Sequence, residues 1–184
     1  MKKFLCIAAM FFAIPTVHFA QWTNTNYYTN DIANNGIFQI IEKDKMLFAA
    51  TSQGIFKSTN NGELWTNASK GLPETRFKCI EKYKNNLIAL TEPYDKQLGF
   101  YISSNNGELW LYKTTNIQEP IELIEEKNDS LFAGTQKGIY YSIDGGNNWV
   151  KSITTPTITQ ENSIGDFEFV GNNIFAATDR RAHV

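Results

Sequence analysis

The sequence predicts an all-β fold: a β-propeller of four-stranded antiparallel blades, about three of them complete and one partial. The first observation is a loop pattern, Ser-x-Asn/Asp-x-Gly-x-x-Trp, which begins at residues 58, 103 and 142. The second is the spacing of 45 and then 39 residues, which leaves room for four short strands in each repeat. The third is that no segment beyond the N-terminal apolar run has helical periodicity.

The three loops, which we call the boxes, are predicted to be structural. Asn-Gly at 61–62 and 106–107 and Gly-Gly at 145–146 favour turns with positive φ at both central residues. The Asn or Asp two residues before the last Gly is suited to accept hydrogen bonds within the turn. Burial of each indole contributes about 4–6 kcal/mol as an upper bound. The boxes comprise Ser58, Asn60, Gly62 and Trp65; Ser103, Asn105, Gly107 and Trp110; and Ser142, Asp144, Gly146 and Trp149.

The N-terminus has the pattern of a secretory signal peptide. Two lysines precede an apolar run from Phe4 to Val17, and Ala20 is the expected cleavage position. The run is too short for a transmembrane helix. We therefore predict a signal peptide over residues 1–20 and one propeller domain over residues 21–184. The mature protein is expected to be secreted, periplasmic or on the cell surface, with no membrane span after cleavage.

Each repeat is expected to contain four short strands. The first repeat extends from about residue 37 to residue 68, and the middle repeat carries five extra residues around 93–98. The expected strands of the second repeat are 76–83, 86–91, 99–104 and 109–114. Those of the third repeat are 121–127, 130–135, 138–142 and 149–153.

Both ends of the chain carry parts of a further blade. Trp22, in "QWTNTN", matches the "LWTNAS" that ends the first box and predicts an outermost strand. Residues 166–184 supply an inner strand, a second strand and the start of a third. Two interpretations remain open. The sequence is a truncated piece of a larger propeller, which we favour, or it is a four-bladed ring closed by the N-terminal strand.

Composition excludes some partners. A net charge of −2 with 20% charged residues gives no indication of a nucleic-acid partner. The two histidines, His18 and His183, lie in the leader and at the C-terminal end, and the third box offers one carboxylate, so we expect no metal and no cofactor. Cys79, in a strand-like segment, is predicted to be a small buried side chain rather than a nucleophile.

The boxes resemble those of the Asp-box (BNR) repeat propellers, although two of them have Asn where that family more often has Asp. The resemblance covers about residues 21–184. It implies the propeller fold and leaves function open, because the family includes sialidases, other exported glycoside hydrolases, sortilin-type receptor domains and propellers similar to photosystem II assembly factors.

The arginines argue against sialidase activity. The sialidase pattern implies three arginines from different blades and an Arg-Ile-Pro motif. The motif is absent, and the chain has only Arg76, Arg180 and Arg181, of which two are adjacent. We therefore predict a non-catalytic binding or assembly scaffold for a protein or glycan ligand. The alternative is a fragment of an exported, sialidase-like glycoside hydrolase, and a third hypothesis is a purely structural cell-surface repeat.

Ligand contacts are expected opposite the boxes, on the face formed by connections between blades and by loops between second and third strands. Loops on a rigid scaffold usually carry function. The candidate residues on this face are Tyr94, Asp95, Lys96, Glu119 and Glu161.

Overall fold

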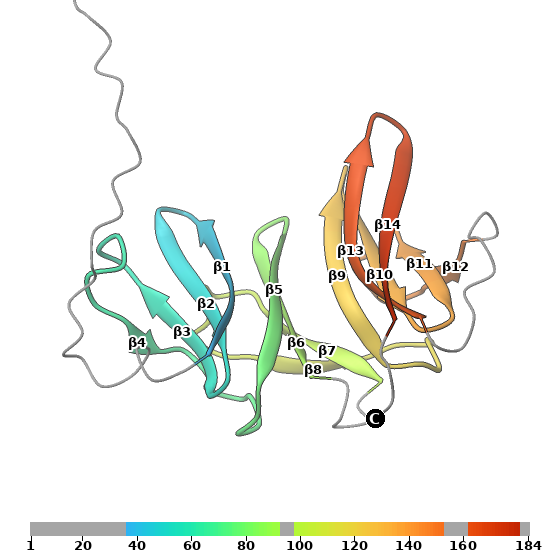
Figure 1. Cartoon of the computed structure of the whole chain (residues 1–184). Coiled ribbons are helices and arrows are strands. Elements are labelled where there is room, and N and C mark those ends of the chain that lie inside the picture. Colours follow the sequence, from blue (N-terminus) through green and yellow to red (C-terminus); the bar gives the residue numbers. More distant parts are fainter. Residues whose placement is uncertain (1–35, 93–97, 153–161, 181–184) are drawn as a thin grey trace, which may run out of the picture.

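The protein is an arc of antiparallel β-sheets, which confirms the predicted fold class (Figure 1). The computed structural model describes residues 36–92, 98–152 and 162–180. Over these ranges it contains three four-stranded sheets, one two-stranded sheet and no helix. No membrane-spanning helix is found among the described residues. The predicted signal peptide and the Trp22 strand lie outside them and stay predictions.

Each sheet is a blade whose strands follow one another in chain order. Blade 1 contains β1 (Ile37–Lys43), β2 (Met46–Thr51), β3 (Gly54–Ser58) and β4 (Thr66–Asn67). Blade 2 contains β5 (Phe77–Tyr83), β6 (Asn86–Thr91), β7 (Gly99–Ser103) and β8 (Leu111–Thr114). Blade 3 contains β9 (Ile121–Lys127), β10 (Ser130–Thr135), β11 (Gly138–Ser142) and β12 (Val150–Lys151). Blade 4 is represented by β13 (Asn162–Val170) and β14 (Asn173–Arg180).

The outermost strands are shorter than predicted, since β8 begins after Trp110 and β12 after Trp149. The reason lies in their main-chain hydrogen bonds. The Trp110 N–H donates to the carbonyl oxygen of Lys70 at 2.9 Å, and the Trp149 N–H donates to Oδ1 of Asn116 at 2.9 Å. Both acceptors belong to the linker that precedes the blade. These two residues therefore bond to the preceding linker rather than to a neighbouring strand.

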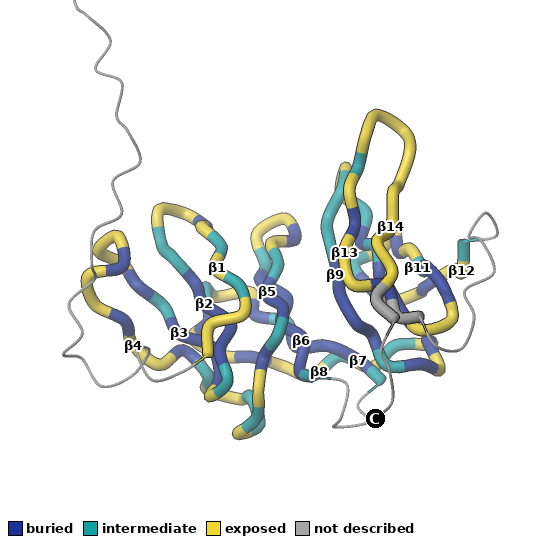
Figure 2. Tube along the Cα trace, viewed as in Figure 1, coloured by how far each residue is buried: buried dark blue, intermediate teal, exposed yellow. Residues whose placement is uncertain are grey.

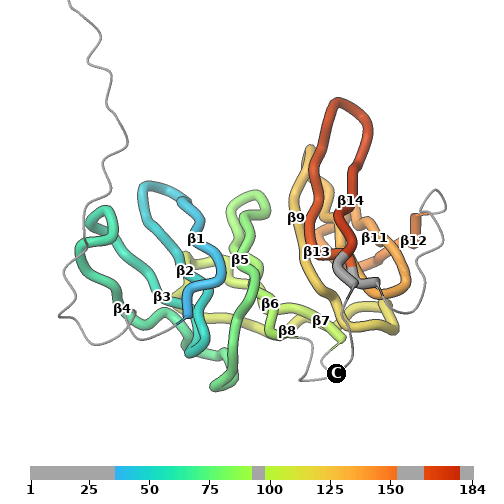
Figure 3. The backbone as a smooth tube through the Cα atoms, viewed as in Figure 1, coloured from blue at the N-terminus to red at the C-terminus, as the bar shows by residue number. Residues whose placement is uncertain are grey.

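The blades are arranged around a common axis. Their inner strands β1, β5, β9 and β13 are neighbours, and the second strand of each blade packs on the inner strand of the next (Figures 1 and 3). Lys43, at the end of β1, donates to Oδ1 of Asn106 in the second box at 2.8 Å. The inner-hairpin turns and the boxes thus share one face, the box face. Connections between blades and turns between second and third strands share the other, the linker face, where Ser52 N–H donates to Gly36 O at 2.9 Å.

Most of the core lies between blades, where neighbouring sheets bury apolar side chains against each other. Buried positions are dark blue in Figure 2. A small cluster of Ala49, Phe56 and Trp65 lies on blade 1 alone. The cluster between blades 1 and 2 includes Phe48, Phe77, Leu87, Tyr101 and Trp110. The cluster between blades 2 and 3 includes Ile88, Phe100, Ile124, Leu131 and Trp149. A third cluster, including Leu123, Ile164 and Phe167, joins blade 3 to blade 4.

Trp110 joins blade 2 to blade 1 through both its ring and its N–H group. Its side chain is 1% exposed, and its indole Nε1–H donates to the carbonyl oxygen of Ala68 at 2.7 Å. The third box approaches blade 2 just as closely. A Cβ on Gly146 would come within 2.6 Å of the Phe100 ring, and its φ of +80° independently favours glycine.

We expect Trp110→Ala to lower the free energy of unfolding by about 3–5 kcal/mol because it opens a cavity between two blades. Trp110→Phe should cost about 1–3 kcal/mol, since it keeps an aromatic ring but leaves the Ala68 carbonyl without its donor. Urea denaturation measures both. Leu111→Ala, at a residue that is 61% exposed, is the control and should change stability by less than about 0.5 kcal/mol. Equal losses for the three variants would contradict this account.

Candidate functional site

The three boxes are closed by the same set of hydrogen bonds. In the first, the Ser58 hydroxyl donates to Oδ1 of Asn60 and accepts from the Gly62 N–H, both at 2.9 Å. Oδ1 of Asn60 also accepts from the Leu64 N–H at 2.9 Å. The second box repeats these contacts from Ser103 and Asn105, and the third from Ser142 and Asp144. The shared oxygen that closes the loop acts only as an acceptor, from the serine hydroxyl and from main-chain N–H groups, so an amide serves as well as a carboxylate.

The third box holds its carboxylate ionised. The main-chain N–H of Asn148, its side-chain amide and the Ser142 hydroxyl all bond to Asp144, and together with the Asn147 N–H they lower the pKa of Asp144 to about 2. The positive φ values predicted for the turns are present, for example 57° at Asn61 and 86° at Gly62. The contacts of all three boxes therefore serve to shape the loops.

The predicted ligand face is only partly described. Tyr94, Asp95, Lys96 and Glu161 lie outside the described residues and stay predictions. Glu119 lies on the linker face between β8 and β9, as expected, but it is 9% exposed. Its carboxylate contacts Lys137 Nζ at 2.8 Å and accepts from the Tyr140 hydroxyl at 3.0 Å. Desolvation raises the pKa of Glu119, but these two hydrogen bonds outweigh it and leave the pKa lowered. Its contacts fasten the linker to blade 3.

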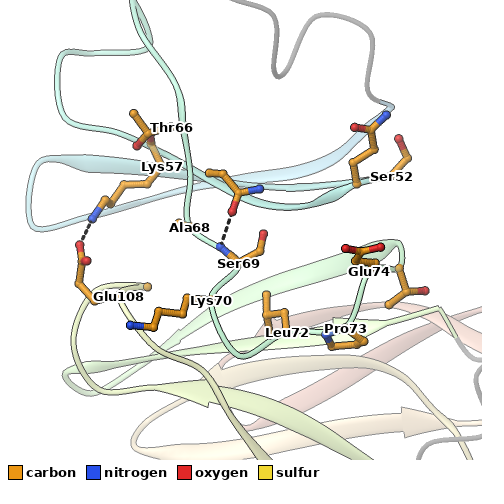
Figure 4. A pocket seen from close by; sticks show the side chains of 14 residues that line it. Ser52, Lys57, Thr66, Ala68, Ser69, Lys70, Leu72, Pro73, Glu74 and Glu108 are labelled. Carbon is orange, nitrogen blue, oxygen red and sulfur yellow. Dashed lines mark hydrogen bonds and ion pairs between the residues drawn. The ribbon is translucent and has the colours of Figure 1, made fainter.

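A groove of about 840 Å³ follows the seam between blades 1 and 2 (Figure 4). We call it the seam groove. One wall is β4 with its residues Thr66 and Asn67, the floor is the linker of residues 68–75, and Gly107 and Glu108 of the second box close one end. Sequence reasoning placed part of this linker on the linker face but did not find the groove.

The seam groove has charged groups at both ends. Lys57, Glu108 and Lys70 lie at one end in Figure 4, and Ser52 and Glu74 lie at the other. Lys57 and Glu108 form an ion pair, and this hydrogen bond is the main reason that the pKa of Glu108 is lowered. Within the described ranges, neither the Lys70 ammonium nor the Glu74 carboxylate has a hydrogen-bond or ion-pair partner. Both groups can therefore pair with a ligand without breaking an internal contact.

In the seam between blades 2 and 3, a side chain bridges the linker and the third box. Asn116 donates from Nδ2 to the carbonyl oxygen of Trp149 at 2.9 Å and accepts the Trp149 N–H on Oδ1 at 2.9 Å. Lys113 Nζ donates to Oδ1 of Asn147 at 2.6 Å across the same seam. Between blades 1 and 2, the main-chain oxygen of Lys70 makes the corresponding contact, so its side chain remains in the groove.

A smaller pocket of about 340 Å³ lies on the axis, between the inner strands. Lys78 of β5 and Glu122 of β9 form an ion pair there at 2.9 Å, with side chains that are 17% and 3% exposed. Cys79 is buried as predicted, and burial raises the pKa of its thiol to about 11, so it remains a neutral thiol near pH 7. No grouping of three or more His, Cys, Asp or Glu suited to a metal ion occurs in the described part of the chain.

Several carboxylates lie close together near the axis, on the box-face side of this ion pair. Desolvation raises the pKa of Glu125 to about 7, and the nearby charges of Asp166, Glu81 and Glu168 add to the shift. Desolvation also raises the pKa of Glu81, on the neighbouring inner strand. The axis therefore concentrates negative charge where β5, β9 and β13 approach one another.

Sheets of this kind, with inner strands around one axis, define a β-propeller. No protein-family profile matches the chain, and no curated protein is similar to it in sequence. The similarity is to solved structures, at identities that show the fold alone.

The extracellular domain of BT4673 from B. thetaiotaomicron is similar with a TM-score of 0.66 and 15% identity over 84% of this chain. The chain spans only 21% of that domain. YCF48 bound to D1 peptide is similar with a TM-score of 0.57 and 15% identity, covering 81% of this chain and 54% of YCF48. The computationally designed Ika4 protein is similar with a TM-score of 0.56 and 8% identity, covering 79% of this chain and 86% of Ika4.

We expect Lys78→Met to lower the free energy of unfolding by about 3–5 kcal/mol, because it leaves the buried Glu122 carboxylate without its cation. The double variant Lys78→Met/Glu122→Leu should recover most of that loss, since a buried pair replaced by apolar groups is often neutral. Urea denaturation at pH 7 measures both variants. A double variant that is less stable than Lys78→Met would contradict the expectation.

We expect Glu125→Gln to stabilise the protein more at pH 8 than at pH 5. A carboxyl group whose folded pKa is about 7, against 4.5 as its ordinary value, binds its proton more tightly in the folded state. Stability is therefore lost as pH rises between these values, by on the order of 1 kcal/mol after allowance for solvent screening. Chemical denaturation at both pH values tests this, with Glu126→Gln on the same strand as control. A gain that does not depend on pH would contradict it.

Proposed function

We propose that the protein is an exported, non-catalytic β-propeller that acts as a binding or assembly scaffold, and that the seam groove is its ligand site. The groove carries the proposal. Its volume of about 840 Å³ lies within the range of ligand sites in proteins, roughly 300–1,000 Å³. It also presents a cation and a carboxylate, on Lys70 and Glu74, with no partner among the described residues.

We assign the three loops to the Asp-box (BNR) type. The assignment is supported by the Ser, Asn or Asp, Gly and Trp residues that recur at the same spacing and by the hydrogen bonds that recur with them. In this assignment the boxes hold the blades in shape, and ligand contacts come from the connections between blades. Export is supported by the leader pattern of residues 1–20 and by the extracellular location of the BT4673 domain.

A protein ligand is favoured over a glycan. YCF48, which has a similar fold, has been solved with a peptide bound. Because that similarity shows the fold alone, the ligand class is our proposal for this chain. The groove supports it independently, since none of the described residues that line it is aromatic. Sugar rings are commonly bound against the faces of aromatic side chains.

The glycoside hydrolase alternative receives less support. Glycoside hydrolysis uses two carboxyl groups that face each other across the scissile bond. Glu119 is bound by Lys137 and Tyr140, and Glu108 is paired with Lys57 at the opposite end of the groove from Glu74. Asp95 and Glu161 lie outside the described residues. The described carboxylates thus offer no facing pair in the seam groove.

Selection of peptides from a random display library on the immobilised, purified chain tests the function. Selected peptides should bind saturably by titration calorimetry. Thr66→Trp, which narrows the groove at the first residue of β4, should weaken binding by about tenfold or more. The matched control is Val150→Trp, at the first residue of β12 in blade 3, which should change affinity by less than about twofold.

Two results would overturn the proposal. One is turnover of a polysaccharide by the purified chain, measured as released reducing ends. The other is the absence of saturable peptide binding, or an equal loss of binding in the Thr66→Trp and Val150→Trp variants.

A further inference from the structure

We infer that the seam groove takes one extended polypeptide strand, which runs antiparallel to β4 and carries a basic side chain at most about four residues before an acidic one. This inference rests on the proposed function of the groove as a ligand site. It adds the secondary structure, the direction and the charge order of the ligand.

The first step is the open edge of β4. Its pairing with β3 joins Phe56 to Asn67 and Lys57 to Thr66, and the Ala68 N–H continues the ladder to Ile55 O at 2.8 Å. Because main-chain groups alternate sides along a strand, the N–H and C=O of Asn67 point away from β3. No described strand pairs with this second edge. An exposed strand edge is the template to which an extended peptide adds.

The second step is that this edge is held rigid. Oδ1 of Asn67 accepts the Ser69 N–H at 2.9 Å. The Ser69 hydroxyl in turn donates to Ile55 O at 3.0 Å and accepts the Ile55 N–H at 2.9 Å. These bonds fix the end of β4 and the start of the groove floor before any ligand arrives. A preorganised edge lowers the ordering cost of binding.

The third step is the direction of the ligand. β4 leaves the first box and runs toward the linker, so it passes from the box face to the linker face. Lys70 lies near Glu108 of the second box, whose pKa it helps to lower, and Glu74 lines the groove together with Ser52 of the β2–β3 turn. A strand antiparallel to β4 therefore enters beside Glu74 and leaves beside Lys70. Its basic residue comes first and its acidic residue second.

The fourth step is the spacing. Lys70 and Glu74 are four positions apart along the linker, so their Cα atoms are separated by at most about 14 Å, and the Leu72 N–H bond to Ser69 O at 2.9 Å shortens this distance further. A ligand strand rises about 3.3 Å per residue, so the two ligand charges are at most about four residues apart. Leu72 and Pro73 line the groove between the two charged residues and provide apolar contact for the side chains in the middle of the ligand.

Two blocked heptapeptides test the inference. One has a lysine before an aspartate with Thr-Val-Thr between them, and the other has the two charged residues exchanged. Binding to the full chain is followed by two-dimensional NMR of the labelled protein. We expect the lysine-first peptide to bind about fivefold more tightly and to shift the amide signals of Thr66 and Asn67. The double variant Lys70→Glu/Glu74→Lys should prefer the aspartate-first peptide by a similar factor.

A charge-matched control separates the groove from general electrostatics. Glu63→Lys/Lys84→Glu exchanges two exposed charges outside the groove and should keep the wild-type preference. Thermal melts followed by circular dichroism confirm that each variant is folded.

The same preference in both the wild type and the swapped variant would overturn the inference, and so would tighter binding of the aspartate-first peptide by the wild type. Cellohexaose that shifts the same amide signals, unaffected by the charge swap, would assign the groove to a glycan. If the charge order has no effect but library-selected peptides still lose affinity in Thr66→Trp, the strand arrangement is wrong and the proposed function stands. If no peptide binds in either experiment, both are wrong.

Discussion

The packing of one blade on the next, fixed by the tryptophans of the second and third boxes, is the contact on which the structure depends. Trp110 bonds to Ala68 through its indole and to Lys70 through its main chain, so one residue fastens blade 2 to the linker at two points directly after β4 of blade 1. Trp149 bonds its indole within its own box and its main chain to Asn116. Four-stranded sheets with apolar faces are thereby joined through a separate apolar cluster at each seam.

The contact between the tryptophan N–H and the preceding linker also determines where the seam groove lies. Both seams need an acceptor for the tryptophan N–H, and either a side chain or the main chain can supply it. Asn116 supplies a side chain, which bridges the seam between blades 2 and 3. Lys70 supplies its carbonyl oxygen, which leaves the seam between blades 1 and 2 hollow and its ammonium group toward the hollow. The groove therefore lies at the seam where main chain rather than a side chain accepts the tryptophan N–H.

This explains what sequence reasoning found and what it missed. The boxes and the strand periods depend on local patterns, so the fold class, the repeat boundaries and the burial of Cys79 were predictable. The partners of Glu119 were not, because Lys137 and Tyr140 belong to the next blade and a charged loop residue does not reveal them. The groove was also missed. Its only signal is that Gly71 stands where the next linker, at the 45-residue offset between the boxes, has Asn116. That difference does not by itself reveal whether main chain or side chain reaches the tryptophan.

The distribution of paired and unpaired charges favours the proposed binding in the seam groove over binding on the axis. At the axis, Lys78 and Glu122 already satisfy each other in a buried setting, so a ligand that recruits either one must break an internal pair and leave a buried charge. In the seam groove, Lys70 and Glu74 gain a partner when a ligand binds, and the main-chain edge of Asn67 gains hydrogen bonds that solvent now provides. A ligand can therefore form new ion pairs in the seam groove, whereas the charged groups Lys78 and Glu122 at the axis are already paired with each other. In a fold whose inner strands pack closely around one axis, polar groups without an internal partner are found more readily in the seams between the outer parts of the blades.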